Sequence, residues 1–252
     1  MAQNVLITGG ATRIGRVISI ALGKAGWNVV VHHHRSKRDA GEVVSTLQDL
    51  GVRTFAVAAD FSDPHQTANL ISDAKSRLGP IDCLINNAAL FEYDNINTLS
   101  RESWDTHFNI NLTAPLLLSQ KFAEQISANG EGNIINIIDQ RVWNPTPHFI
   151  SYTLSKTGLW TLTQTLALAL APKIRVNGIG PGPTLPSARQ TKEDFELQWQ
   201  TLPLKRRVMP QDISDAVLYI LSAKSMTGQM IALDSGQHLS WYPSPPDAVG
   251  KE

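Results

Sequence analysis

Short apolar runs alternate along the chain with longer segments in which apolar residues recur every three or four positions. The runs are NVLIT at 4–8, WNVVVH at 27–32, RTFAVAAD at 53–60, IDCLIN at 81–86, NIINIID at 133–139 and KIRVNGIG at 173–180. The helical spacing covers 13–25, 39–50, 64–78, 100–126 and 152–170. Strands that alternate with helices in this way predict parallel βαβ units. We therefore expect an α/β fold, a single Rossmann-type doubly wound parallel sheet with helices on both faces.

The C-terminal part of the chain departs from this rhythm. Residues 181–208 contain several prolines, clustered charges and one short helical stretch near 193–199, which predicts a substrate loop. A final helix from about Pro210 and a strand around 228–234 should complete the sheet. The Pro-rich tail, 240–252, is expected to be irregular, with Trp241 and Tyr242 available to dock on a neighbouring surface.

Composition adds limits to this picture. The chain has 252 residues, 42% of them hydrophobic and 17% charged, with no linker, so residues 1–252 are predicted to form one domain. Lys plus Arg and Asp plus Glu both number 22, and this balance argues against nucleic-acid binding. No leader or membrane-length apolar stretch is seen, so we expect a cytoplasmic protein with no membrane association. Cys83 stands alone in an apolar strand pattern and is expected to be a buried bystander.

A glycine-rich turn follows the first predicted strand. LITGGATRIG places Gly9, Gly10 and Gly15 between that strand and the first helix, where backbone N–H groups and the helix N-terminus can approach a pyrophosphate. Arg13 lies in the same turn, beside the pyrophosphate or within reach of a planar ligand over the nicotinamide. The turn predicts a dinucleotide site.

The end of the second strand indicates which dinucleotide. It reads VHHHRSKR, without the carboxylate that usually contacts the ribose of NAD, and offers His34, Arg35 and Ser36 to a 2′-phosphate instead. NADPH is therefore the predicted cofactor, although a solvated basic turn would give the same letters. The complete set of cofactor-binding candidates is Gly9, Arg13, Ile14, Gly15, His34, Arg35, Ser36, Asp60, Phe61, Asn87, Ala88, Tyr152, Lys156, Pro181 and Gly182.

Candidate catalytic side chains gather around the fifth strand. Tyr152 and Lys156 are four residues apart and share one face of a helix, where the ammonium group is expected to lower the tyrosine pKa. Asp139 stands where the strand ends. It either takes part in proton transfer or simply satisfies polar groups at a strand end.

Together these motifs resemble the short-chain dehydrogenase/reductases over essentially the whole chain. TGGATRIG, NNAA at 86–89, Asn111 in NINL, YTLSK and PGP at 181–183 match that family's landmarks in order and spacing. The resemblance implies that Asn111, Tyr152 and Lys156 are catalytic, that no metal is needed, and that the protein is a homotetramer. The apolar helix over 152–170 agrees with a subunit contact, or with a central core helix.

Two departures from the general family pattern narrow the resemblance. Asp139 stands where most members carry serine, and Arg13 stands where many carry glycine. With HHHRS and Phe91 they are similar to the pteridine reductase branch, which includes bacterial dihydromonapterin and alternative dihydrofolate reductases. The branch implies that Asp139, Tyr152 and Lys156 are catalytic, and that Arg13, Phe91, Asp139 and Tyr152 contact a pterin or folate substrate.

The carboxylate also has a chemical reading of its own. A ketone reductase must stabilise an oxyanion, which an ionised acid repels, whereas reduction of C=N also delivers a proton to nitrogen. Asp139 therefore favours an NADPH-dependent reductase of a pteridine or dihydrofolate-like substrate. A carbonyl or 3-oxoacyl reductase that tolerates Asp139 is the alternative, and a non-catalytic NADP-binding regulator is a third. Ala89 and Leu90, where trypanosomatid pteridine reductases have serines, leave the choice of pterin open.

Overall fold

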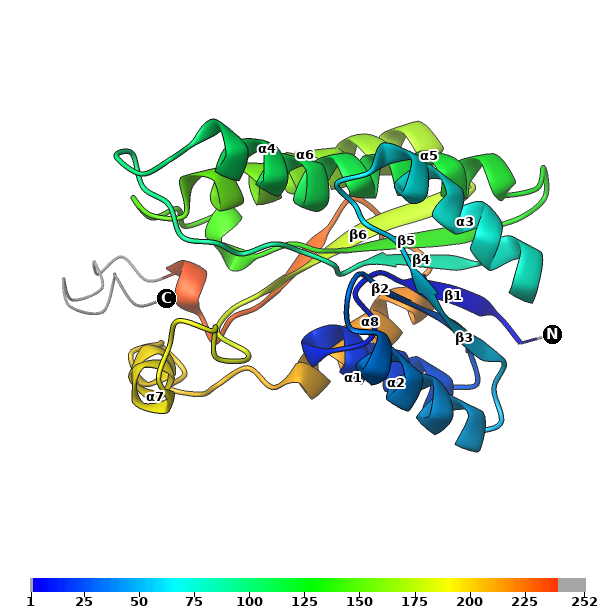
Figure 1. The fold of residues 1–252 in the computed structure, drawn as a ribbon, viewed down its shortest axis with the longest axis horizontal. Helices are drawn as coiled ribbons and strands as arrows, with labels where there is room; N and C mark the ends of the chain where they lie inside the picture. The colour runs from blue at the N-terminus through cyan, green and yellow to red at the C-terminus, as the bar shows by residue number, and fades with distance from the viewer. Residues whose placement is uncertain (1, 240–252) are drawn as a thin grey trace.

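The computed structural model describes residues 2–239, which contain one seven-stranded sheet whose strands are all parallel. The strands are β1 (Asn4–Ile7), β2 (Asn28–His33), β3 (Thr54–Ala58), β4 (Cys83–Asn86), β5 (Gly132–Ile137), β6 (Ile174–Pro181) and β7 (Met230–Leu233). Their order across the sheet is β3-β2-β1-β4-β5-β6-β7. Helices cover both faces, which confirms the predicted doubly wound α/β fold (Figure 1).

The helices form two layers around the sheet. They are α1 (Arg13–Lys24), α2 (Lys37–Asp49), α3 (Pro64–Leu78), α4 (Arg101–Phe108), α5 (Ala114–Gln125), α6 (Ile150–Leu170), α7 (Lys192–Gln200) and α8 (Pro210–Ser222). Helices α1, α2 and α8 lie on one face, and α3, α4, α5 and α6 lie on the other (Figure 1). Helix α7 belongs to the predicted substrate loop and stands apart from both layers (Figure 1).

Two large hydrophobic cores, one on each face, hold these layers to the sheet, and a smaller cluster contains Ile138, Leu159 and Met230. Along β1, Val5 and Ile7 face the core formed with α1, α2 and α8, whereas Leu6 between them faces the core formed with α3 and α5. All three side chains are fully buried. Because parallel strands are buried on both faces, they read as continuous apolar runs rather than alternating ones.

The order of the strands creates a crevice at one edge of the sheet. Strand β1 pairs with both β2 and β4, so the chain leaves β1 in one direction and later crosses to the other side. The connections after β1 and β4 therefore diverge beyond the carboxyl ends of these strands, where doubly wound sheets bind ligands.

Three further expectations concern a membrane span, Cys83 and the C-terminal tail. Within residues 2–239, no helix combines the length and the apolarity needed to cross a bilayer. Cys83 is fully buried on β4, as predicted. Trp241 and Tyr242, with the rest of the tail, lie outside the described residues.

Candidate active site

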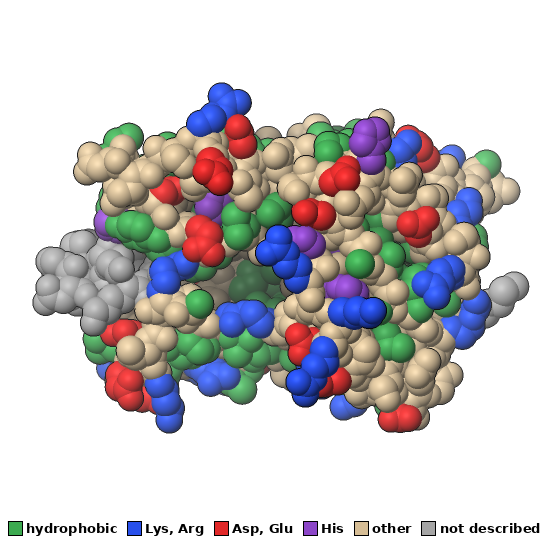
Figure 2. Space-filling view, in the orientation of Figure 1, with side chains coloured by type: hydrophobic (Ala, Val, Ile, Leu, Met, Phe, Trp, Pro, Cys, Tyr) green, Lys and Arg blue, Asp and Glu red, His purple; other side chains and the backbone are tan. Residues whose placement is uncertain are grey.

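A cavity of about 620 Å³ opens at the carboxyl ends of the strands. Figure 2 shows it as a hollow in the middle of one face, with basic side chains on its rim. Among the described residues, all the predicted cofactor-binding and substrate-binding side chains line this cavity, as do Asp139, Tyr152 and Lys156. Asn111 is the one candidate that does not line it.

The glycine turn forms the floor of the cavity at the end of β1. Gly9 has a φ of +62°, a conformation that glycine adopts without strain. A Cβ added to Gly15 would lie 2.1 Å from the Gly9 carbonyl oxygen and 2.6 Å from Asn87 Nδ2. Asn87 Nδ2 donates to the carbonyl oxygens of Thr8 (2.9 Å) and Gly9 (3.2 Å), which ties the turn to the end of β4. The missing side chains of Gly9 and Gly15 therefore keep the turn compact, and its contact with a pyrophosphate stays a prediction.

A buried histidine supports this turn from β2. His32 Nδ1 accepts a hydrogen bond from Gly9 N at 3.0 Å, so its Nε2 carries the proton and donates to the Ala59 carbonyl at 3.1 Å. Its ring stacks on Phe61, with 4.4 Å between centroids. Burial lowers the His32 pKa from 6.5 to about 4, so the ring stays neutral at neutral pH. The triple-histidine sequence alone does not reveal which histidine has this supporting role.

The end of β2 brings basic and hydroxyl side chains to the cavity. His34, Arg35 and Ser36 line the cavity there, and no carboxylate stands among them. Asp60, after β3, lies 3.3 Å from His34 Nε2 and accepts hydrogen bonds from the Ser62 backbone and hydroxyl, which lower the Asp60 pKa. The basic and hydroxyl groups suit the extra anionic group that distinguishes NADPH from NADH.

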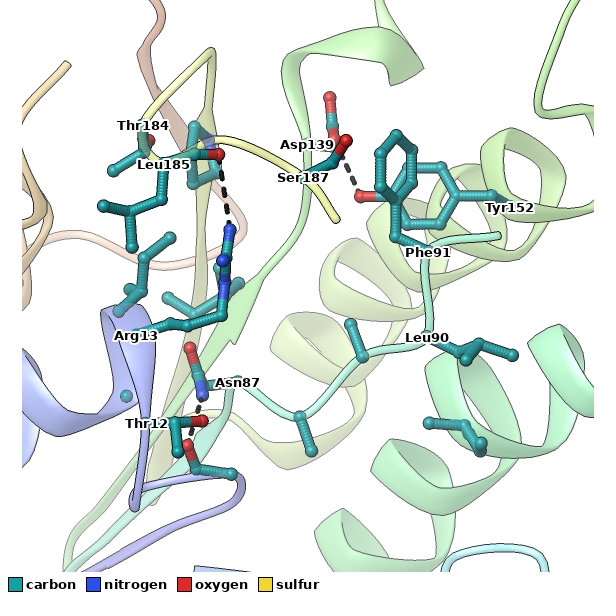
Figure 3. Close-up of a pocket in the computed structure, with 18 of the residues that line it drawn as sticks. Thr12, Arg13, Asn87, Leu90, Phe91, Asp139, Tyr152, Thr184, Leu185 and Ser187 are labelled. Carbon is teal, nitrogen blue, oxygen red and sulfur yellow. Dashed lines mark hydrogen bonds between the residues drawn. The ribbon is translucent and has the colours of Figure 1, made fainter. Parts of the chain in front are cut away.

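Asp139 and Tyr152 are directly hydrogen-bonded at the opposite end of the cavity. Tyr152 OH donates to Asp139 Oδ2 at 2.7 Å (Figure 3). Asp139 Oδ1 accepts from the backbone N–H of Arg141 at 2.8 Å, where the chain leaves β5 in a short 3₁₀ turn, Gln140–Val142. The carboxylate is thus oriented by the backbone and presents its second oxygen to the phenol.

The predicted effect of Lys156 on Tyr152 is wrong for this structure. The Tyr152 pKa is raised well above its ordinary value, because the phenol is buried and because the nearby Asp139 carboxylate disfavours a phenolate. Lys156 Nζ lies 5.9 Å from the centroid of the Tyr152 ring and donates to the Ile137 carbonyl at 2.8 Å. Burial lowers the Lys156 pKa from 10.5 to about 8. Tyr152 is therefore a protonated donor at neutral pH.

Phe91 and Arg13 flank the space in front of Tyr152 (Figure 3). Phe91 stacks on buried Phe149 at 4.6 Å and meets the Tyr152 ring edge-on at 4.7 Å. Phe91 therefore packs partly into the protein while it lines the cavity. Arg13 Nη2 donates to the carbonyl oxygens of Leu185 (3.3 Å) and Pro186 (3.0 Å) in the predicted substrate loop. This contact ties the loop to the turn between β1 and α1. The partners are separated by more than 170 positions in the sequence, and local sequence patterns do not specify such a contact.

Asn111 acts on the site through another residue. It lies in a π-helical turn, Asn109–Thr113, between α4 and α5, and is fully buried. Its side chain accepts from Leu90 N (2.8 Å) and donates to Leu90 O (3.0 Å) and Ser155 Oγ (3.0 Å). It therefore fixes the residue before Phe91 and the helix that carries Tyr152.

Among residues 2–239, no three His, Cys, Asp or Glu side chains gather as a metal site requires. The cavity is lined by the glycine turn, by the end of β2 and by the hydrogen-bonded pair Asp139 and Tyr152.

Comparison with known proteins agrees with this geometry. The short chain dehydrogenase family model matches residues 3–197. A 3-oxoacyl-(acyl-carrier-protein) reductase of Staphylococcus epidermidis is 31% identical, over 95% of this chain and 100% of its own. A short-chain type dehydrogenase/reductase of Picea abies is 29% identical, over 92% of this chain and 91% of its own.

Solved structures resemble the whole fold. The FolM alternative dihydrofolate reductase 1 of Brucella canis, crystallised with NADP, is 45% identical with a TM-score of 0.92, covering 97% of this chain and 96% of its own. A blue fluorescent protein from a metagenomic library, in complex with NADPH, is 27% identical with a TM-score of 0.87, covering 93% and 97%. The family model spans most of the chain, and the glycine turn, Tyr152 and Lys156 meet in one cavity. The chain therefore belongs to the short-chain dehydrogenase family.

Proposed function

We propose that this protein is an NADPH-dependent reductase of a pteridine or dihydrofolate-like C=N substrate. The observation that carries the proposal is the 2.7 Å hydrogen bond from Tyr152 OH to Asp139, in a cavity that Phe91 and Arg13 also line. The 45% identity to an alternative dihydrofolate reductase supports it.

The residues divide the chemistry between them. NADPH, when bound, supplies the hydride. Tyr152 is protonated at neutral pH and is placed to give its proton to a ring nitrogen, after which Asp139 is placed to return a proton to the phenolate from solvent. Lys156 holds its charge close to this pair and, with Gly9 and Gly15, forms part of the cofactor site. Phe91 offers an aromatic surface to a flat heterocycle.

The cofactor preference rests on the end of β2. Arg35 carries a permanent charge and, with His34 and Ser36, offers donors to a 2′-phosphate. The two solved structures described above contain NADP or NADPH, which supports the same choice.

A carbonyl or 3-oxoacyl reductase is the second candidate. It is favoured by the 31% identity to a 3-oxoacyl-(acyl-carrier-protein) reductase across nearly the whole chain. Against it stands Asp139, because an ionised carboxylate hydrogen-bonded to the tyrosine opposes the negative charge that develops on a carbonyl oxygen.

One assay separates the two. NADPH oxidation is followed with dihydrofolate, dihydrobiopterin, dihydromonapterin, an acetoacetyl thioester and simple ketones at equal concentrations. We expect the highest kcat/KM for one of the pteridines or dihydrofolate. Faster turnover of the thioester or of a ketone would refute the proposal and favour the second candidate.

We further propose that the enzyme is a cytoplasmic homotetramer. Leu154 and Leu168 on α6 are 44% and 84% exposed in the single chain, as expected for a face that a neighbouring subunit covers. Light scattering on the purified protein gives its mass directly, and a monomer or a dimer would contradict the proposed tetramer.

A further inference from the structure

A fully buried polar cluster lies behind the active site and takes no part in the chemistry proposed above. Asp94, His107 and Ser151 are at most 1% exposed and come from the loop after β4, from α4 and from the first turn of α6. Ser151 Oγ lies 2.8 Å from His107 Nδ1 and donates a short hydrogen bond to Asp94 Oδ2. The cluster does not line the cavity.

The hydrogen bonds exclude a nucleophilic serine. His107 Nε2 accepts from the backbone N–H of Glu92 at 3.1 Å, so the neutral ring carries its proton on Nδ1, which lies 3.0 Å from the Ser103 carbonyl. Nδ1 therefore cannot accept a proton from Ser151. The Ser151 hydroxyl is also closed off from solvent and from the cavity.

The same bonds instead fix the backbone on both sides of the active site. His107 holds Glu92, the residue after Phe91, whereas Asn111 holds Leu90, the residue before it. Phe91 is therefore anchored through both of its neighbours by buried side chains.

Asp94 in the same way holds the start of α6, the helix that carries Tyr152. Its carboxylate accepts from Ser151 N at 3.3 Å, and its carbonyl accepts from Phe149 N at 2.7 Å. Phe149 has a φ of 57°, a left-handed conformation that a bulky residue adopts only where its surroundings enforce it. Phe149 is also the ring on which Phe91 stacks.

We propose that Asp94, His107 and Ser151 form a positioning network that sets the distance between the Phe91 ring and the Tyr152 phenol. Within this network, His107 holds the loop by accepting the hydrogen bond from Glu92 N. The proposal rests on the proposed function for its substrate. His107 holds Glu92 only while Nε2 is unprotonated and can accept the hydrogen bond. A proton on Nε2 would make this nitrogen a donor that faces the Glu92 N–H, which is also a donor.

Protonation of His107 at low pH should therefore break its hydrogen bond with the loop. Burial lowers the His107 pKa below 6.5, and the opposing influences are the Ser103 carbonyl and the negative charges of Asp94 and Glu92. Tyr152, the other titratable group that faces the ring, lies 6.2 Å away between centroids and is neutral. Below the His107 pKa the Glu92 N–H loses its acceptor, and the loop keeps its other contacts, among them those of Asn111 with Leu90 and of Arg189 with Phe91 and Glu92.

The test compares two substitutions of the same residue. His107→Gln places an amide oxygen near the position of Nε2 and does not titrate, whereas His107→Leu fills the space without an acceptor. The first readout is backbone hydrogen–deuterium exchange of peptides covering 89–96, which needs no substrate. We expect at least tenfold faster exchange in His107→Leu and near wild-type exchange in His107→Gln at neutral pH. Each exchange rate is divided by that of the glutamine variant at the same pH. As pH falls below 6.5, this ratio should rise for the wild type towards the value of the leucine variant.

The second readout is kinetic. For whichever substrate the wild type reduces best, His107→Leu should raise KM by about tenfold while the NADPH dissociation constant stays within twofold. Ser119→Ala, which removes another fully buried serine hydroxyl, from α5, is the control for a purely structural loss. If His107→Leu lowers thermal stability as Ser119→Ala does but leaves exchange over 89–96 and KM unchanged, the network does not position the loop. A wild type that reduces no pteridine would refute the proposed function and would leave the exchange test to decide this proposal.

Discussion

Lys156 illustrates how a buried charge is balanced at the scale of one residue. Its ammonium group donates a hydrogen bond to the Ile137 carbonyl, and burial lowers its pKa to about 8. A lowered pKa in the folded protein means that unfolding takes up a proton between about pH 8 and the ordinary lysine value near 10.5. The lysine therefore opposes folding most at neutral pH, and this penalty declines as pH rises.

This sign gives a prediction for the protein without cofactor. Relative to Lys156→Met, the wild type should gain about 2 kcal/mol of unfolding free energy between pH 7 and pH 9.5, since one pKa unit corresponds to about 1.4 kcal/mol. Urea denaturation of both proteins at the two pH values measures it. A difference between the proteins that does not change with pH would show that Lys156 keeps an ordinary pKa.

Arg35 gives a second prediction at this scale. Replacing it by alanine should weaken NADPH binding by about 1.5–3 kcal/mol, the range for hydrogen bonds to charged groups, and leave NADH binding nearly unchanged. Arg38→Ala is the matched control, because Arg38 is three positions away, its side chain is 91% exposed, and it does not line the cavity. Equal losses for NADPH and NADH in Arg35→Ala would show that this arginine does not recognise the 2′-phosphate.

At the scale of elements, the turn between β1 and α1 depends on close backbone approach. The Cβ of alanine at Gly15 would meet the Gly9 carbonyl oxygen at 2.1 Å, so the turn must shift. We predict that Gly15→Ala raises the NADPH dissociation constant at least tenfold, or about 1.4 kcal/mol. Gly41→Ala is the control, since nothing lies within 4 Å of its added Cβ on α2. Titration of cofactor fluorescence measures both, and unchanged binding in Gly15→Ala would contradict the pyrophosphate site.

The helical segment between β4 and β5 contains a feature that the sequence pattern does not predict. The helical spacing over 100–126 predicts one helix, and the chain does continue helically from α4 through a π turn to α5. Periodicity of apolar residues does not distinguish a π turn from an α turn. The π turn places Asn111 inward on Leu90, and it therefore explains a positioning role that the motif alone leaves unspecified.

For the whole molecule, the pattern of apolar residues was enough to predict most of the strands and helices. The predicted strands and their helices are present because strand residues reach a hydrophobic core on either face of the sheet, and most of the covering helices pack onto these cores. The glycine turn and the end of β2 could be assigned to a cofactor because fold topology brings strand ends to one edge. The Tyr152 pKa could not be predicted, because its direction depends on burial and on a 2.7 Å contact with a residue 13 positions away. The hydrogen bonds from Arg13 to the carbonyl oxygens of Leu185 and Pro186 likewise depend on tertiary structure and could not be predicted.

The central claim is that the Asp139–Tyr152 pair adapts this family fold to C=N reduction. Asp139→Asn keeps the acceptor for the Arg141 N–H but removes the proton exchange, and Asp139→Ser offers a neutral donor to an oxyanion. Both changes should leave NADPH affinity unaltered, because Asp139 lies at the opposite end of the cavity from the 2′-phosphate site.

The decisive measurement is kcat for a pteridine and for a carbonyl substrate with the wild type and these two variants. We predict that Asp139→Asn lowers kcat for the pteridine by about 100-fold, the lower end of general acid–base effects. Asp139→Ser should also lower pteridine reduction while it raises carbonyl reduction, so the two activities move in opposite directions. Pteridine reduction by Asp139→Asn at the wild-type rate across neutral pH would contradict the account.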